Sequence, residues 1–355
     1  MKERKKLVIG ITSGDIYGIG CEVILKSLND ARILELLTPV IYTSPKVIAY
    51  YRKALGLVNL NTTTVRSAEE AQNERINVVN CINGEIRIEM GKSTTHAGEM
   101  ALASLNAAVG EIKKGYLDGL VTAPVSKYNI QSEQFHFAGH TEYLQSEFGA
   151  DTVLMLMTSA KMRMGILTGH VPLAEAPALI THDKLLSTLR LIGKAMLEDF
   201  NIDRARIAVL SLNPHAGDNG LLGKEEQTII IPAIEKAQNE GILAFGPFPS
   251  DGFFGTDNYR NYDVILSMYH DQGMTPFKTL CFDTGVNYTA GLPIVRTSPA
   301  HGTAFDIAGA NVASPESFRQ ALYMACDLAA NRKQYKSLIA NAMKDIELKP
   351  SLNDE

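Results

Sequence analysis

Short apolar runs alternate with amphipathic helical patterns along most of this chain, and this alternation limits the folds open to it. Runs typical of buried strands occupy residues 7–12, 119–122, 162–168, 206–212, 263–268 and 291–295. Apolar residues at helical spacing predict helices at 22–28, 96–114, 183–199, 224–239 (with a break or kink at Pro232) and from Ser314-Pro315-Glu316 onward. Such alternation is typical of an α/β fold with helices flanking a mostly parallel sheet.

Length and charge narrow the class of protein. The chain has 355 residues, enough for one large or two medium-sized domains. Its formal charge of −5 provides no general attraction to nucleic acid or to an anionic membrane. No apolar run approaches the roughly 20 residues of a membrane span, and the run at 7–12 is too short for a signal-peptide core. Four widely spaced cysteines favour reduced thiols and a cytoplasmic location: Cys21, Cys81, Cys281 and Cys326.

Three histidines come shortly after predicted strands. His170, His215 and His270 follow the third, fourth and fifth of the apolar runs. Ligands of parallel α/β sheets bind outside the carboxyl ends of the strands, so these imidazoles are expected to meet around one divalent metal. Three histidines suit zinc best, with magnesium or cobalt as alternatives, and leave positions open for a substrate. The alternative is that each histidine is a loop residue bonded to nearby backbone.

Acidic residues near these histidines are candidates for proton transfer. Asp271 directly follows His270, and Asp251 lies upstream of it. Carboxylates in such places orient a metal-bound imidazole or accept a proton. The alternative is that Asp251 and Asp271 are ordinary acids of surface turns.

Basic and polar residues indicate a substrate with two anionic groups. Lys278, Asn287 and Arg296 are spaced by about nine residues around an apolar run, and a guanidinium binds phosphate or carboxylate through two hydrogen bonds. Lys278 is also a candidate base if it lies beside a metal. His140 and Thr141 offer a donor pair for the same kind of anion. A solvated surface would explain any one of these residues alone.

Two glycine-containing segments are candidate ligand loops. The turn at 13–20 matches neither the dinucleotide fingerprint nor the phosphate-binding loop, and a tight strand-to-helix turn explains it without a ligand. In the second segment Gly302 stands beside Thr303, with Asp306 three residues further on. This pattern lets a flat ligand approach the backbone and lets the acid accept hydrogen bonds from ribose hydroxyls.

Together these segments resemble the 4-hydroxythreonine-4-phosphate dehydrogenase family of pyridoxal phosphate synthesis. The resemblance covers about residues 8–330, and its most specific stretches are Leu212–Gly217, Met268–Gly273 and Arg296–Thr303. It implies that a divalent metal, shared across a homodimer interface, is bound by His170, His215 and His270. It implies that the substrate is bound by His140, Thr141, Lys278, Asn287 and Arg296.

The loop at 301–309 is also similar to the cofactor loop of isopropylmalate dehydrogenases, whose fold the family shares. This similarity implies NAD, or alternatively NADP, near Gly302, Thr303 and Asp306. It further implies two α/β lobes with the active site in the cleft between them, formed by residues 1–128 plus 305–355 and by residues 129–304. The first turn departs from the family, which usually has proline where Ile16 and Cys21 stand here.

The resulting hypothesis is a metal- and NAD-dependent oxidation of 4-(phosphooxy)-threonine. The product, a β-keto acid, would decarboxylate to 3-amino-2-oxopropyl phosphate. Related enzymes that oxidise threonate or erythronate 4-phosphate share nearly all these residues, so the exact substrate is left open. Two other hypotheses are a metal-dependent hydrolase or transferase and a non-catalytic sensor of a phosphorylated metabolite.

Overall fold

A computed structural model of the chain describes residues 6–133 and 135–340. The strands are β1 (Leu7–Thr12), β2 (Leu37–Thr43), β3 (Thr62–Val65), β4 (Ile76–Asn80), β5 (Gly119–Thr122), β6 (Leu154–Thr158), β7 (Arg163–Ile166), β8 (Ile207–Leu210), β9 (Ala244–Phe248), β10 (Val264–Ser267), β11 (Val286–Ala290) and β12 (Arg296–Pro299). The α-helices are α1 (Gly20–Leu28), α2 (Ile33–Leu36), α3 (Pro45–Ala54), α4 (Thr95–Lys113), α5 (His140–Phe148), α6 (Ala176–Leu179), α7 (His182–Glu198), α8 (Ile231–Asn239), α9 (Ser250–Gly255), α10 (His270–Cys281) and α11 (Glu316–Ala340).

The strands of the described residues form one sheet in the order β3-β4-β2-β1-β5-β12-β11-β6-β7-β10-β8-β9. Pairing is parallel from β3 to β12 and again from β7 to β9. The three pairs in the middle, β12–β11, β11–β6 and β6–β7, are antiparallel. The predicted α/β fold with a mostly parallel sheet and flanking helices is confirmed. Because three antiparallel pairs separate them, the two parallel sets run in opposite directions.

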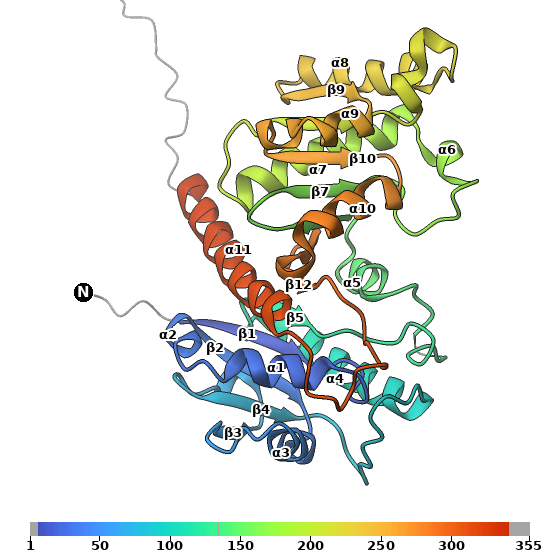
Figure 1. The fold of residues 1–355 in the computed structure, drawn as a ribbon. Helices are drawn as coiled ribbons and strands as arrows, with labels where there is room; N and C mark the ends of the chain where they lie inside the picture. The colour runs from blue at the N-terminus through green and yellow to red at the C-terminus, as the bar shows by residue number, and fades with distance from the viewer. Residues whose placement is uncertain (1–5, 134, 341–355) are drawn as a thin grey trace, which may run out of the picture.

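Figure 1 shows two groups of elements at opposite ends of this sheet, the N-terminal elements in blue and those from α6 to α10 in green to orange. Helix α11 contacts α1 and β1 among the N-terminal elements, β5, β11 and β12 in the middle of the sheet, and α7 in the second group, so it packs against both groups. The predicted division into lobes, with boundaries at 128 and 304, stays a prediction.

Local sequence signals account for the long helices. The Thr94 hydroxyl accepts a hydrogen bond from the backbone of Ala97 and caps α4, and Thr181 caps α7 by accepting from the backbone of Lys184. Buried faces of these helices cover the sheet, and the apolar residues predicted to face inward from α11 are buried: Phe318, Leu322, Ala325 and Leu328. Burial of each leucine or phenylalanine side chain among these stabilises the fold by about 1.5–3 kcal/mol.

Two predicted elements differ in the structure. Residues 291–295 are not a strand but connect β11 to β12, because Gly291 turns the chain with a φ of 91° and Pro293 has no N–H for a ladder. The helix predicted at 224–239 begins instead as a π-helical turn, η3 (Glu226–Ile230). Pro232 stands at the start of α8, directly after this turn, so the predicted break takes the form of a change of helix type just before the proline.

The glycine turn is explained by packing. Gly14 has a φ of 62°, and a Cβ atom there would lie 2.3 Å from the carbonyl oxygen of Pro124. A Cβ atom on Gly18 would lie 2.6 Å from the carbonyl oxygen of Thr303. The turn therefore needs glycine for close backbone approach. All four cysteines are free thiols, and no helix among the described residues is long and apolar enough to cross a membrane.

Candidate active site

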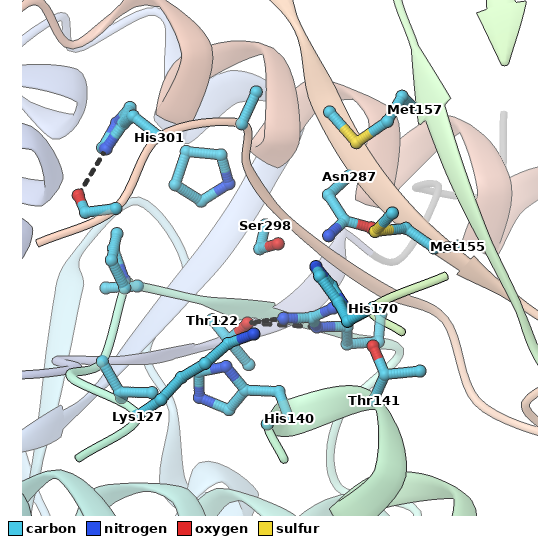
Figure 2. Close-up of a pocket in the computed structure, with 18 of the residues that line it drawn as sticks. Thr122, Lys127, His140, Thr141, Met155, Met157, His170, Asn287, Ser298 and His301 are labelled. Carbon is cyan, nitrogen blue, oxygen red and sulfur yellow. Dashed lines mark hydrogen bonds between the residues drawn. The ribbon is translucent and has the colours of Figure 1, made fainter. Parts of the chain in front are cut away.

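A cavity of about 320 Å³ lies against one face of the antiparallel middle of the sheet. Side chains alternate between the two faces of a strand, and this face carries Thr122 of β5, Met155 and Met157 of β6, Asn287 of β11, and Arg296 and Ser298 of β12. Helices α5 and α10 and the loop at 299–302 complete the wall (Figure 2). All five predicted substrate-binding residues line this cavity: His140, Thr141, Lys278, Asn287 and Arg296.

Arg296 is the main charge of the cavity wall. It is 3% exposed, and its guanidinium donates to the hydroxyl of Thr122 at 3.1 and 2.6 Å and to that of Thr289 at 3.1 Å. No carboxylate among the described residues lies within ion-pair distance. Burial lowers the pKa of Arg296 to about 10, partly offset by the charge of Glu142, so the group stays protonated at neutral pH. A buried cation with only hydroxyl partners is suited to binding an anion.

Two polar atoms beside Arg296 have no hydrogen-bond partner among the described residues. The Nε2 atom of His140 and the Oδ1 atom of Asn287 are both buried and unpartnered. Burial, and then the charges of Arg296 and Lys127, lower the pKa of His140 to about 3, so its imidazole is neutral. Because an unpaired buried polar group costs about 1–3 kcal/mol, these atoms indicate a polar ligand.

His170 and His270 come together at the mouth of the cavity. Their ring centroids are 5.1 Å apart, close to the roughly 5 Å expected for two imidazoles bound tetrahedrally to one zinc ion. The Nδ1 atom of His270 lies 2.7 Å from the carboxylate of Asp271, which leaves its Nε2 atom for a metal. Burial, and then the charges of Lys127 and His270, lower the pKa of His170 and favour the neutral form that a metal requires.

The structure does not bring His215 to these two histidines within one chain. It is exposed on the loop after β8 and does not line the cavity. No cluster of three metal-binding side chains is found in the described ranges, so a complete three-histidine site within one chain is not formed. The prediction of a metal bound by all three histidines and shared across a homodimer interface is not tested by a single chain and stays a prediction.

The loop that carries His215 has an unusual backbone conformation. Five consecutive residues, 215–219, have positive φ values between 41° and 79°, a conformation that costs a non-glycine residue about 1–2 kcal/mol. The buried carboxylate of Glu226 fixes the start of this loop, because it accepts hydrogen bonds from the backbone of Leu212 at 2.9 Å and Asn213 at 2.8 Å. Strain of this kind is typical of functional segments.

The two predicted acids lie outside the cavity. Asp251, in the first turn of α9, and Asp271 line a separate surface hollow between α9 and α10. Only Asp271 contacts a cavity residue, through its hydrogen bond with His270. Their proposed part in proton transfer stays a prediction.

Of the three predicted cofactor residues, one lines the cavity and two do not. Gly302 lines the cavity, and a Cβ atom there would meet nothing within 4 Å, so the backbone is open to a ligand. The carbonyl oxygen of Thr303 accepts a hydrogen bond from the backbone of Ile19 at 3.0 Å and so packs on the glycine turn. Asp306 is exposed and does not line the cavity.

Several cavity residues were not predicted. Lys127 and Glu142 line it, and Figure 2 shows the Lys127 side chain directed into it. His301 also lines it, with its Nδ1 atom 3.0 Å from the carbonyl oxygen of Gly302 and its buried Nε2 atom unpartnered. The available signal was a polar loop directly after β5, which carries Lys127.

Comparison with known proteins gives a family for this chain. The family described as "Pyridoxal phosphate biosynthetic protein PdxA" matches residues 35–325. The chain belongs to this family. The predicted resemblance and the predicted oxidoreductase class are confirmed, since relatives of the PdxA family are named dehydrogenases.

Individual relatives cover nearly the whole chain. A 4-hydroxythreonine-4-phosphate dehydrogenase of Bacteroides thetaiotaomicron is 50% identical and covers 96% of this chain and 94% of its own. A putative D-threonate 4-phosphate dehydrogenase of Oceanobacillus iheyensis is 36% identical and covers 92% of this chain and 99% of its own. The structure of a putative 4-hydroxythreonine-4-phosphate dehydrogenase from Salmonella typhimurium has a TM-score of 0.78 at 31% identity, covering 91% of this chain and 100% of that one.

Proposed function

We propose that this PdxA-family chain catalyses the NAD-dependent, divalent-metal-dependent oxidation of 4-(phosphooxy)-threonine. The immediate product is a β-keto acid, which loses carbon dioxide to give 3-amino-2-oxopropyl phosphate. The observation that carries the proposal is the buried Arg296, which has no carboxylate partner in the described part of the chain and lies in one cavity with His170 and His270. An anion site beside a pair of neutral imidazoles suits a phosphorylated alcohol.

His170 and His270 are the residues of this chain that would hold a divalent metal. Their spacing and the hydrogen bond from His270 to Asp271 fit an ion, and His215 from a second copy of the chain would supply the third ligand. When bound, zinc, or alternatively magnesium or cobalt, supplies Lewis acidity toward the alcohol oxygen. The strained His215 loop, exposed in one chain, supports the homodimer that this arrangement requires.

The remaining cavity residues bind and orient the substrate. Arg296, His140 and Thr141 would hold one anionic end, and Asn287 would donate or accept through its unpartnered amide. Lys278 lies on the same face of α10 as His270 and Met274, at intervals of four residues, and all three line the cavity.

Lys278 is therefore the first candidate to take the proton of the alcohol. Asp271, or Asp251 through water, is the alternative. NAD, or alternatively NADP, would accept the hydride with its nicotinamide near Gly302, where the backbone is open. Thr303 and Asp306 would contribute from the same loop, which joins the two proposed lobes, 1–128 plus 305–355 and 129–304. A cytoplasmic location, inferred from sequence, is part of this proposal.

The experiment that tests this function is an NAD-reduction assay at about 340 nm over a small substrate panel. We expect 4-(phosphooxy)-threonine to give the highest kcat/KM, with D-threonate and erythronate 4-phosphates as the competing substrates and NADP as the competing cofactor. D-threonate 4-phosphate is included because one relative is named a putative D-threonate 4-phosphate dehydrogenase. Phosphate release without NADH would favour a hydrolase and reject the proposal.

A further inference from the structure

Lys127 is a cation of the cavity to which the proposed function assigns no role. It lies in the loop after β5, and its ammonium has no hydrogen-bond or ion-pair partner among the described residues. Figure 2 shows its side chain running across the cavity floor toward Thr122. An ammonium carries three donors, so this side chain enters the cavity with its hydrogen-bonding capacity unused.

The nearby protein acceptor is already occupied. The Thr122 hydroxyl oxygen accepts hydrogen bonds from both Nε and Nη2 of Arg296, at 3.1 and 2.6 Å. A hydroxyl oxygen has two lone pairs, so no acceptor is left there for Lys127. Its charge reaches the same part of the cavity, since it contributes to lowering the pKa values of His140 and His170 after the effect of burial.

The loop around Lys127 is held from both sides. The side-chain amide of Gln131 donates to the carbonyl oxygens of Lys127 at 3.2 Å and Phe137 at 2.8 Å. The amide of Asn129 donates to the buried carboxylate of Asp15 at 3.2 Å. The backbone of Lys127 is thus fixed before any ligand binds, and only its side chain has to be ordered.

One carboxylate among the described residues lines the cavity, and it does not neutralise Lys127. Glu142 lies in the first turn of α5 and is not within ion-pair distance of either Lys127 or Arg296. A Cβ atom on Gly139 would lie 3.5 Å from Glu142 Oε2 and 3.7 Å from Lys127 Cε, so the glycine occupies the space between these side chains. The charge of Glu142 raises the pKa of Arg296, but among the described residues this carboxylate forms an ion pair with neither cation.

We propose that Lys127 is a further substrate-positioning residue, which binds the phosphoryl dianion of the substrate together with Arg296. This inference rests on the proposed function for the identity of the substrate. Two cations match a charge of −2 better than that of a carboxylate, and three phosphoryl oxygens can accept from both side chains. The first backbone N–H groups of α5, at His140 and Thr141, border the same space and add a favourable helix dipole.

The test compares Lys127→Met, Lys127→Arg and the matched control Lys46→Met. Lys46 is an exposed lysine in the first turn of α3 that does not line the cavity. Binding of inorganic phosphate to each full-length protein is measured by calorimetry, and KM and kcat for 4-(phosphooxy)-threonine are measured separately. Unphosphorylated 4-hydroxythreonine serves as the probe for the carboxylate end.

Loss of one charge-assisted hydrogen bond is expected to weaken phosphate binding and raise KM by about ten- to hundredfold in Lys127→Met. Lys127→Arg should retain most of the affinity, kcat should change much less than KM, and Lys46→Met should behave as the wild type. Wild-type phosphate affinity in Lys127→Met would overturn the proposal, as would weakened binding of 4-hydroxythreonine with phosphate binding intact. If the wild type forms no NADH but phosphate binding still depends on Lys127, the proposed function fails and the anion site stands.

Discussion

At the scale of single residues, the cavity concentrates groups whose protonation is set by burial. Arg296 keeps its charge although burial lowers its pKa to about 10, whereas His140 loses its charge because burial lowers its pKa to about 3. One wall of the cavity therefore combines a permanent cation with a neutral imidazole over the whole neutral range. This division lets Arg296 bind an anion while the unpartnered Nε2 atom of His140 remains free for a hydrogen bond.

The lowered pKa of His140 predicts a pH dependence of stability. Between its folded pKa of about 3 and its ordinary value near 6.5, the unfolded chain binds a proton that the folded chain does not. Stability from this residue therefore rises with pH across that window and is constant above it. His140→Gln should flatten the rise in the midpoint of urea unfolding between about pH 4 and 6.5.

The control for this prediction is His96→Gln, which replaces an exposed histidine of α4. The control should leave the slope of the wild type in place. An unchanged slope in His140→Gln would contradict the buried, neutral state of that imidazole.

At the scale of elements, sequence patterns predicted what local chemistry determines. The helices predicted at 96–114 and 183–199 form, and the hydroxyls of Thr94 and Thr181, directly before them, cap α4 and α7. The middle of the sheet is not determined in this way. The apolar run 291–295 has the pattern of a strand. The chain turns at Gly291, however, and the flanking strands at 286–290 and 296–299 pair with each other instead.

The contact between α4 and the Lys127 loop supports a second prediction. A Cβ atom on Gly98 would lie 1.9 Å from the carbonyl oxygen of Asn129, so Gly98→Ala must displace that loop. We expect a loss of about 1–3 kcal/mol in the free energy of unfolding, together with a raised KM.

The matched variant on the same helix is Gly110→Ala, where a Cβ atom meets nothing within 4 Å. It should stabilise the protein by about 0.5–1 kcal/mol, because alanine favours a helix over glycine. Denaturant unfolding of both variants checks the pair. Equal effects at the two positions would show that the contact with Asn129 is not tight.

At the scale of the whole molecule, the antiparallel centre decides where the cavity forms. The sequence predicted a site at the carboxyl ends of parallel strands, and His170 and His270 do follow β7 and β10. The two parallel sets run in opposite directions, however, so the cavity lies on the face of the middle strands. The five predicted anion-binding residues meet there, while His215 lies outside this cavity in the single chain.

A shared metal site predicts complementation between two inactive variants. His170→Ala and His215→Ala should each abolish NADH formation alone. In a mixed dimer, one site would combine the intact His215 of one chain with the intact His170 and His270 of the other. Mixing equal amounts and allowing exchange should restore about one quarter of wild-type activity, from half of the dimers with one of two sites intact. No recovery after proven exchange would place all three histidines in the same chain's site or in none.

If this cavity oxidises a phosphorylated hydroxy acid with the help of a metal held by His170 and His270, activity depends on that metal. The most direct measurement is NADH formation from 4-(phosphooxy)-threonine by wild-type protein before metal removal, after it, and after zinc is restored. We expect activity to fall by more than about a hundredfold on metal removal and to return with the metal, but not to return in His170→Ala. Undiminished NADH formation by the metal-free protein would contradict it.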